Sequence, residues 1–206
     1  MRIIIPARRN SKGLPFKNRE LLERTLSTIP QSLICNTIIS TDDEEIARVG
    51  KDRGYTIHSR SEYSARDTAP TKEVMEEVVK DMNLSGPLVM LYLTYPSRTW
   101  KDVEKAYDWF IENGGKSMLC KESVETHPFM CLYDLPQNKG AQVVTHDLYR
   151  RQDYPKCFRF CHMVCIFNAE ELKNLNKNLY NKDTIYYSIE HALDVDSKED
   201  FGCIQR

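Results

Sequence analysis

Short apolar runs rich in β-branched residues alternate along this chain with segments of helical periodicity. Extended strands are expected at residues 3–5, 37–40, 55–58, 87–93 and 117–120. Apolar positions three or four residues apart predict helices over about 20–26, 43–53, 72–82 and 101–113, with Asp43 at the start of the second and Thr71 as the N-cap of the third. This alternation is typical of βαβ units, and it predicts an α/β fold: a three-layer αβα, Rossmann-like arrangement with a mostly parallel sheet.

The alternation weakens between about residues 126 and 160, where prolines and a glycine interrupt the chain. Short β-like pieces near 129–133 and 142–144 predict a hairpin excursion from the main sheet. The chain then returns through an expected strand at 164–167, a short helix near 169–175 and a final segment around 192–205. The sequence has no internal repeat and no interdomain linker, so residues 1–206 are predicted to form one domain with this excursion.

The first strand ends at Pro6 in a loop that carries four cations. These are Arg8, Arg9, Lys12 and Lys17, and they lie near Gly13. Ligands of open α/β sheets bind beyond the carboxyl ends of strands, so this loop is a candidate site for a polyanion such as a nucleoside triphosphate. The alternative is an ordinary solvated basic loop. The order Ser11-Lys12-Gly13 does not fit the Walker motif, and the chain contains no G-x-G-x-x-G.

Bulk composition narrows the class of protein. The chain has 206 residues, 41% of them hydrophobic and 29% charged, and a formal net charge of −1. This balance gives no general attraction to nucleic acid, so none is expected as a partner. No apolar run reaches transmembrane length and no signal peptide is recognisable, so we expect a cytoplasmic protein without a membrane partner. The seven cysteines are then expected to be reduced thiols.

Two groups of residues have the composition of metal sites. Cys157, Cys161 and Cys165 are spaced by four, but apolar neighbours and the absence of a C-x-x-C knuckle favour structural cysteines in a buried strand. Asp194 and Asp196 would project side by side from an extended segment, and paired carboxylates suit Mg²⁺. The alternative for these two residues is a helix cap before residues 197–200.

The first loop resembles the signature loop of the CMP-sugar synthetases, closest to the acylneuraminate cytidylyltransferases. The pattern A-R-x-x-S-K-G-x-P-x-K-N is matched by Ala7, Arg8, Ser11, Lys12, Gly13, Pro15, Lys17 and Asn18. Later blocks follow in order: Ser40-Thr41-Asp42, Arg60, Asp67-Thr68-Ala69, then Thr94, Pro96 and Arg98, then His127-Pro128, Arg151-Gln152 and Asp194-Val195-Asp196. The resemblance therefore covers nearly the whole chain.

The resemblance implies an enzyme that joins CTP to an acidic α-keto sugar, a sialic acid or a related nonulosonate, and releases pyrophosphate. It implies a homodimer formed through the excursion and Mg²⁺ on Asp194 and Asp196. Arg8 and Lys17 would hold the triphosphate, and nucleotide contacts are expected from Ala7, Arg8, Ser11, Lys12, Gly13, Lys17, Asn18, Arg60, Asp67 and Thr68. Alternatives are a cytidylyltransferase for another acceptor, such as 3-deoxy-manno-octulosonate, or a non-catalytic nucleotide-binding homologue.

Departures from the family pattern gather where the family contacts the sugar. Tyr92 replaces a Gln and Met130 a Lys; Cys161-His162 replaces an Asn-Gly pair, and Cys165 replaces a Tyr. Tyr92, Arg151 and Cys165 are the sugar-binding residues that the resemblance implies, with Arg151 matched to the sugar carboxylate. The substitutions predict a more apolar acceptor pocket than that of the sialic acid enzymes.

Overall fold

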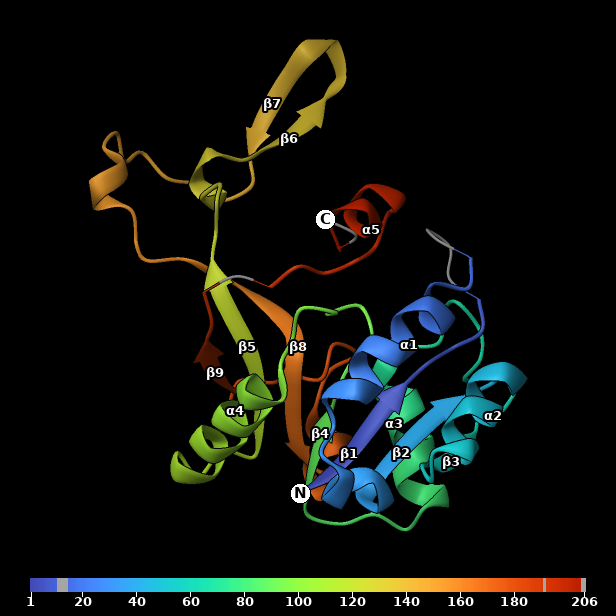
Figure 1. The fold of residues 1–206 in the computed structure, drawn as a ribbon. Coiled ribbons are helices and arrows are strands. Elements are labelled where there is room, and N and C mark those ends of the chain that lie inside the picture. The colour runs from blue at the N-terminus through green and yellow to red at the C-terminus, as the bar shows by residue number, and fades with distance from the viewer. Residues whose placement is uncertain (11–14, 191, 205–206) are drawn as a thin grey trace.

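Within the described residues, a seven-stranded sheet forms the centre of the molecule (Figure 1). The computed structural model describes residues 1–10, 15–190 and 192–204. The strands are β1 Arg2–Pro6, β2 Thr37–Thr41, β3 Thr56–Ser59, β4 Pro87–Met90, β5 Ser117–Ser123, β8 Phe158–Asn168 and β9 Ile185–Ser188. They lie in the order β3-β2-β1-β4-β8-β5-β9. Only β8 runs antiparallel to its neighbours among these strands, which confirms the predicted mostly parallel sheet.

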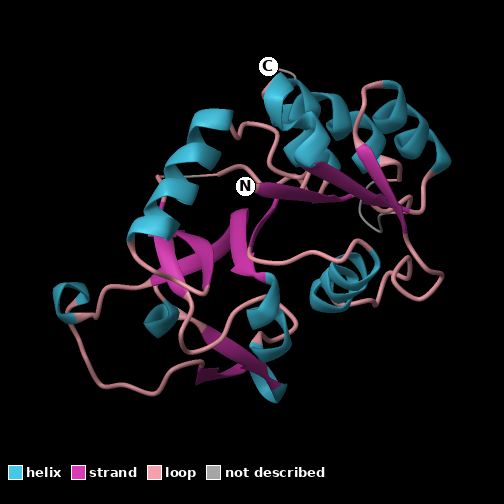
Figure 2. Ribbon diagram, turned by 90° about the horizontal axis from the view of Figure 1, so that it is seen from below, coloured by secondary structure: helices cyan, strands magenta, loops and turns pink. Residues whose placement is uncertain are grey.

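Helices pack on both faces of the sheet and complete the predicted three layers (Figure 2). Helices α1 (Lys17–Thr28), α2 (Glu44–Asp52) and α4 (Trp100–Glu112) share one apolar cluster with Ile3 and Ile5 of β1. On the other face, α3 (Thr71–Asp81) and the 3₁₀ helix η5 (Ala169–Asn174) pack with Ile4. Successive strand residues point to opposite faces of the sheet, so the run Ile3–Ile5 of β1 contributes to both apolar clusters. All three side chains are fully buried.

Local capping explains where several helices begin. Asp43 accepts hydrogen bonds from the backbone N–H groups of Glu45 and Ile46, at 2.9 and 3.3 Å, and so starts α2 as predicted. Thr99 and Asp102 form a reciprocal capping box at the start of α4. The predicted N-cap at Thr71 is wrong, because α3 begins at Thr71 and its N-cap is Pro70. The Thr71 hydroxyl instead bonds to the Tyr92 hydroxyl.

Two other elements differ from the sequence predictions. Strand β8 starts at Phe158, six residues before the expected Val164, because it pairs along most of β5 as well as with β4. The expected short helix near 169–175 is present as the 3₁₀ helix η5. Strand β9 was not predicted, because it is only four residues long and lies among polar residues, so it has no clear apolar pattern. It pairs in parallel with β5 at the edge of the sheet.

The excursion leaves the sheet between β5 and β8 as expected. Its strands β6 (Leu132–Leu135) and β7 (Lys139–Gln142) form a separate antiparallel hairpin that projects away from the main sheet (Figure 1). Short 3₁₀ turns flank the hairpin at Pro128–Met130 and Arg151–Asp153, a third at Pro136–Asn138 connects its two strands, and another, Gln31–Asn36, precedes β2. A cluster of aromatic rings lies within the excursion: Phe129 stacks on His146, and His127 and Tyr154 contact them edge-on or tilted. None of the described helices is long and apolar enough to cross a membrane.

The strand order creates a crevice beside β1. The chain moves from β1 to β2 and β3 on one side, whereas β4 lies on the other side of β1. This reversal is a topological switch point, where open α/β sheets bind their ligands beyond the carboxyl ends of the strands. The segments after β1, β3 and β4 therefore converge on one edge of the sheet.

Candidate nucleotidyltransferase site

A cavity of about 350 Å³ opens at this edge, within the size range of small-molecule sites. Side chains from the ends of β1, β3 and β4, from α1 and from the segment before the last helix line it. The charged lining residues are Arg8, Lys17, Arg60, Arg66, Asp67, Asp194 and Asp196. Cations and carboxylates predicted from separate parts of the sequence thus share one space.

Four residues predicted for the first loop lie at this edge of the sheet: Ala7, Arg8, Lys17 and Asn18. Ala7 is buried and its N–H donates to the Ser40 carbonyl at 2.8 Å, which holds the loop against β2. Arg8 lines the cavity and pairs with Asp67. The Asn18 amide donates to the Arg8 carbonyl at 2.8 Å, so α1 fixes the loop from its other end. The predicted contacts Ser11, Lys12 and Gly13 lie outside the described residues.

Lys17 is nearly buried at the start of α1. Its ammonium donates to the Val195 carbonyl at 2.8 Å and to Asp196 Oδ1 at 2.9 Å. The predicted triphosphate lysine therefore also orients the predicted metal ligand. Burying this cation requires such partners, because an unpaired buried charge is costly.

Asp194 and Asp196 are both exposed and line the cavity, whereas Val195 between them is buried. This is the alternation expected of an extended segment. The helix that follows, α5 (Lys198–Ile204), is capped by a different pair: the backbone N–H of Asp200 donates to Ser197 Oγ at 3.2 Å, and its carboxylate accepts the Ser197 N–H at 2.8 Å. The cap alternative for the two aspartates is therefore unnecessary, and their oxygens face the cavity.

Arg60 and Asp67 meet the cavity from the segment after β3. Arg60 Nε donates to the Ser40 carbonyl and hydroxyl at 3.1 and 3.2 Å. Burial lowers the pKa of its guanidinium to about 10, so Arg60 still carries its charge at neutral pH. Thr68 is exposed between two lining residues but does not itself line the cavity.

Three aromatic side chains form another wall of the cavity: Tyr92 was predicted as a sugar contact, whereas Tyr95 and His162 were not predicted as site residues. Tyr95 lies near Asp194, and burial together with that carboxylate raises the pKa of the Tyr95 hydroxyl above its ordinary value. Burial also raises the pKa of Tyr92 to about 12. The His162 ring stands edge-on to Tyr92, with centroids 5.6 Å apart, and burial lowers its pKa. The sequence offered one indication of a role for His162, because Cys161-His162 replaces the Asn-Gly pair of the family motif.

Not every substituted or predicted sugar position reaches this cavity. Cys165 is fully buried in the cluster under α3, where burial raises the pKa of its thiol. Met130 and Arg151 lie exposed in the excursion and do not line the cavity of their own chain. Cys161 is buried on β8, while Cys157 is only partly buried. Among the described residues, the donor atoms close enough together to hold a metal ion belong to His58, Glu77 and Asp81, and not to these cysteines.

The doubly covered, mostly parallel sheet, with a crevice lined by cations and paired carboxylates at its switch point, matches the class of α/β nucleotidyltransferases. The chain belongs to the cytidylyltransferase family, whose model matches residues 2–200. It is 28% identical to post-translational flagellin modification protein B of Campylobacter coli over 98% of this chain and 92% of that protein. It is 27% identical to CMP-N,N'-diacetyllegionaminic acid synthase of Legionella pneumophila, over 98% of this chain and 94% of that protein.

Two further similarities agree with this assignment. N-acylneuraminate cytidylyltransferase of Streptococcus agalactiae serotype V is 26% identical over 96% of this chain and 51% of its own length, so the chain spans about half of that relative. Among solved structures, a CMP:2-keto-3-deoxy-manno-octonic acid synthetase complexed with CTP superposes with a TM-score of 0.70 at 11% identity, covering 99% of this chain and 96% of that one. The latter similarity establishes the fold alone.

Proposed function

We propose that this protein transfers a cytidylyl group from CTP to an acidic α-keto sugar of the nonulosonate class. The anomeric hydroxyl oxygen attacks the α-phosphorus, the bond to the β-phosphate oxygen breaks, and pyrophosphate leaves while the hydroxyl proton is lost. The observation that carries the proposal is the convergence of Arg8, Lys17 and Arg60 with Asp194 and Asp196 on one cavity, in a chain of the cytidylyltransferase family.

Catalysis would rest on positioning and charge stabilisation, since phosphoryl transfer needs little covalent help from the protein. Arg8 and Lys17 hold the triphosphate, assisted by Lys12 and the backbone near Gly13. Asp67 keeps the Arg8 guanidinium at the cavity wall through their ion pair. Arg60 and Asn18 complete the nucleotide side, and Thr68, predicted as a nucleotide contact, lies outside the cavity lining.

The carboxylates of Asp194 and Asp196 fit Mg²⁺. They are hard oxygen donors, they are exposed enough to leave room for coordinated water, and they lie beside the cations proposed to hold phosphate. A bound magnesium ion supplies charge neutralisation at the phosphates and promotes loss of the acceptor proton. Lys17 holds the Asp196 carboxylate in place by a hydrogen bond, and Tyr95 lies near the Asp194 carboxylate.

The acceptor would occupy the part of the cavity walled by Tyr92 and His162. Relatives over most of the chain include proteins named for N-acylneuraminate, pseudaminic acid and N,N'-diacetyllegionaminic acid, which supports an acidic nonulosonate as acceptor. Arg151 would bind the sugar carboxylate through its planar fork. Cys165 contributes indirectly, since Tyr92 packs against the cluster that contains it.

A second copy of the chain would complete the site. The excursion exposes Leu132, Tyr133 and Leu135 on an isolated two-stranded hairpin, an arrangement that is marginal in water without a partner. A twofold dimer through this hairpin would cover these side chains. It would also bring Arg151 toward the partner's cavity. The cytoplasmic location expected from the sequence stays a prediction.

Pyrophosphate release from CTP and Mg²⁺ across a panel of keto sugars tests the proposal. N-acetylneuraminate, a diacetylated nonulosonate and 3-deoxy-manno-octulosonate form the panel, with UTP and ATP in place of CTP as nucleotide controls. Release that requires both CTP and a nonulosonate supports the proposal. Release only with 3-deoxy-manno-octulosonate reassigns the acceptor, and CTP binding without release with any sugar identifies a non-catalytic nucleotide-binding protein.

A further inference from the structure

Arg60 is held in the cavity wall by unusually defined contacts. Its backbone N–H donates to the Thr41 carbonyl at 3.1 Å, and its side-chain Nε donates to both oxygens of Ser40. Both side-chain bonds use Nε, so the two terminal nitrogens carry the remaining donors of the guanidinium. The direction in which Arg60 presents those donors therefore depends on where the Ser40 hydroxyl lies.

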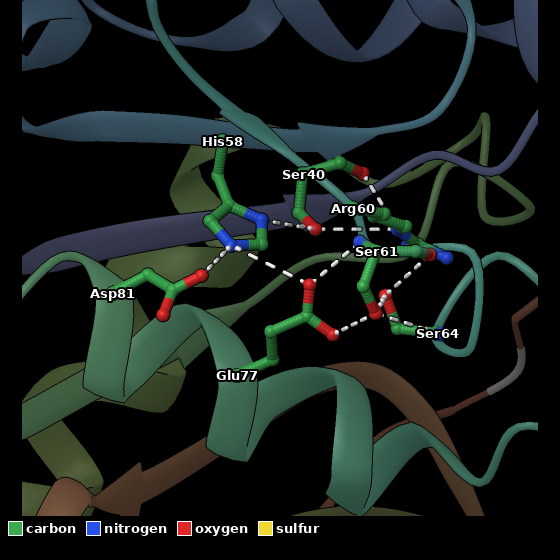
Figure 3. Close-up of polar contacts among 7 residues, drawn as sticks. All are labelled: Ser40, His58, Arg60, Ser61, Ser64, Glu77 and Asp81. Carbon is green, nitrogen blue, oxygen red and sulfur yellow. Dashed lines mark hydrogen bonds and ion pairs between the residues drawn. The ribbon is translucent and has the colours of Figure 1, made fainter.

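The Ser40 hydroxyl is in turn fixed by a buried histidine (Figure 3). Ser40 Oγ lies 3.1 Å from Nδ1 of His58, and Nε2 of the same ring lies 3.3 Å from Asp81 Oδ2. Arginine can only donate and an ionised carboxylate can only accept, so with a neutral His58 ring the chain of hydrogen bonds has one direction. Arg60 donates to Ser40, Ser40 donates to His58, and His58 donates from Nε2 to Asp81.

A second carboxylate of α3 fixes the backbone next to Arg60. Glu77 accepts the Ser61 N–H at 2.7 Å and the Ser61 hydroxyl at 2.9 Å, and it lies 4.0 Å from His58 Nε2. Burial alone would raise the pKa of the Glu77 carboxyl, but hydrogen bonds from Ser61 and Ser64 outweigh it and lower that pKa. We call the chain of hydrogen bonds Arg60–Ser40–His58–Asp81 the relay. Helix α3 holds the Arg60 side chain through Asp81 of this relay, and it holds the next residue, Ser61, through Glu77.

We propose that His58 is a positioning residue for nucleotide binding, which acts by holding the Ser40 hydroxyl against Arg60. The inference rests on the proposed function, because it takes the ligand presented to Arg60 to be CTP. His58 is buried between β3 and α3 and does not line the cavity, so it acts only through its neighbours. His58, Glu77 and Asp81 have donor atoms within 4.8 Å of one another, and the relay accounts for that grouping without an ion.

Calorimetric binding of CTP tests the inference independently of any sugar. His58→Leu removes both ring nitrogens, so the Ser40 hydroxyl is no longer held against Arg60. We expect CTP binding to weaken about tenfold, which corresponds to the free energy of about one hydrogen bond. His58→Asn places an amide oxygen near Nδ1 and is expected to recover most of the affinity. Asp81→Ala, at the half-exposed end of the relay, is expected to weaken binding about threefold. Glu76→Ala, on the same helix outside the relay, is the matched control and should bind as the wild type does.

A double-mutant cycle separates positioning from mere stability. In an Arg60→Ala background, His58→Leu is expected to have no further effect on the affinity for CTP, although it still changes the melting temperature. An equal loss of affinity in both backgrounds, or a lowered melting temperature with unchanged affinity, overturns the inference. If His58→Leu does not fold, Asp81→Ala takes its place in the cycle under the same criteria. Failure of the wild type to bind CTP instead refutes the proposed function, and the inference with it.

Discussion

The ammonium of Lys17 lies 2.9 Å from the carboxylate of Asp196, a residue 179 positions further along the chain. The lysine side chain is 7% exposed and the aspartate side chain 77% exposed, so the pair joins a buried cation to an anion at the cavity mouth. Lys17 also binds the carbonyl between the two aspartates. The region predicted to hold the triphosphate and the region predicted to hold a metal are therefore parts of one hydrogen-bonded unit.

Replacing Lys17 is expected to affect both ligand binding and stability. Lys17→Ala should abolish most of the rise in melting temperature that CTP and Mg²⁺ produce, because a cation at the proposed triphosphate site is lost. It should also lower the free energy of unfolding of the apo protein by about 1–3 kcal/mol, since the buried Val195 carbonyl loses its donor. Thermal denaturation with and without CTP measures both effects. Lys51→Ala on α2 is the control, and a full CTP-induced rise in Lys17→Ala would contradict the assignment.

The paired carboxylates are expected to be essential for turnover but not for folding. Asp194→Asn and Asp196→Asn each remove an anionic oxygen while keeping the shape of the side chain. We expect each to lower kcat by about two orders of magnitude at saturating Mg²⁺ while the protein still folds, with the larger change in melting temperature in Asp196→Asn, which takes the anionic partner from Lys17. Pyrophosphate release and thermal denaturation measure the two quantities. Asp183→Asn, an equally exposed aspartate, should retain activity; near wild-type rates in both cavity variants would exclude the proposed metal role.

The apolar hairpin predicts self-association. At micromolar concentration, sedimentation velocity should show a dimer, because Leu132 and Tyr133 are 63% and 60% exposed on a hairpin without a core. Leu132→Glu should shift the equilibrium to monomer and reduce kcat/KM for the sugar if Arg151 serves the partner's cavity. Ile111→Glu, an exposed apolar residue on α4, should remain dimeric. A wild-type protein that sediments only as monomer refutes this arrangement.

Stability should depend on pH through Asp43. Burial opposes ionisation, but Arg19 and the two helix N–H groups more than offset it, and the pKa of Asp43 falls below its ordinary value. A carboxyl with a lowered folded-state pKa stabilises the fold above its unfolded pKa of about 3.9, and this contribution disappears as the pH falls through the folded-state pKa. Asp43→Ala should cost about 1–2 kcal/mol at pH 7 and progressively less below pH 4. Urea unfolding at pH 7 and below pH 4 measures this cost. Asp52→Ala, exposed at the other end of α2, is the control and should show no such pH dependence. A cost of Asp43→Ala that stays the same at both pH values would refute the prediction.

The sequence predicted features set by local pattern better than features set by contacts across the fold. The strand at 3–5 and the helix start at Asp43 depend on residues close in sequence, and both were predicted correctly. Thr71 looked like a cap because its preference is local, yet its hydroxyl is used by Tyr92, 21 residues away. His58 gave no local signal, because its role depends on Ser40 and Asp81, from a neighbouring strand and a later helix. The identity of cavity residues follows from which strand ends meet, and sequence spacing does not encode this.

Acceptor choice should depend on His162, which stands where the family pattern has a glycine. The ring narrows the cavity beside Tyr92, and its Nε2 donates to the Asn178 carbonyl at 3.0 Å, so its position is fixed. Because burial lowers its pKa, the ring is neutral at pH 7 and offers the acceptor no cation. We expect a modified nonulosonate, deoxygenated or carrying extra acyl groups, to exceed N-acetylneuraminate in kcat/KM by about tenfold or more.

His162→Gly tests the origin of that preference. Removing the ring restores the family residue, so the ratio of kcat/KM between the modified nonulosonate and N-acetylneuraminate should fall toward one. His146→Gly is the control: it removes an equal ring from the excursion, outside the cavity, and should leave the ratio unchanged. A wild-type protein that clearly prefers N-acetylneuraminate would show that other residues rebuild the usual contacts. An unchanged ratio in His162→Gly would place the selectivity elsewhere, with Arg151 of a second copy as the next residue to substitute.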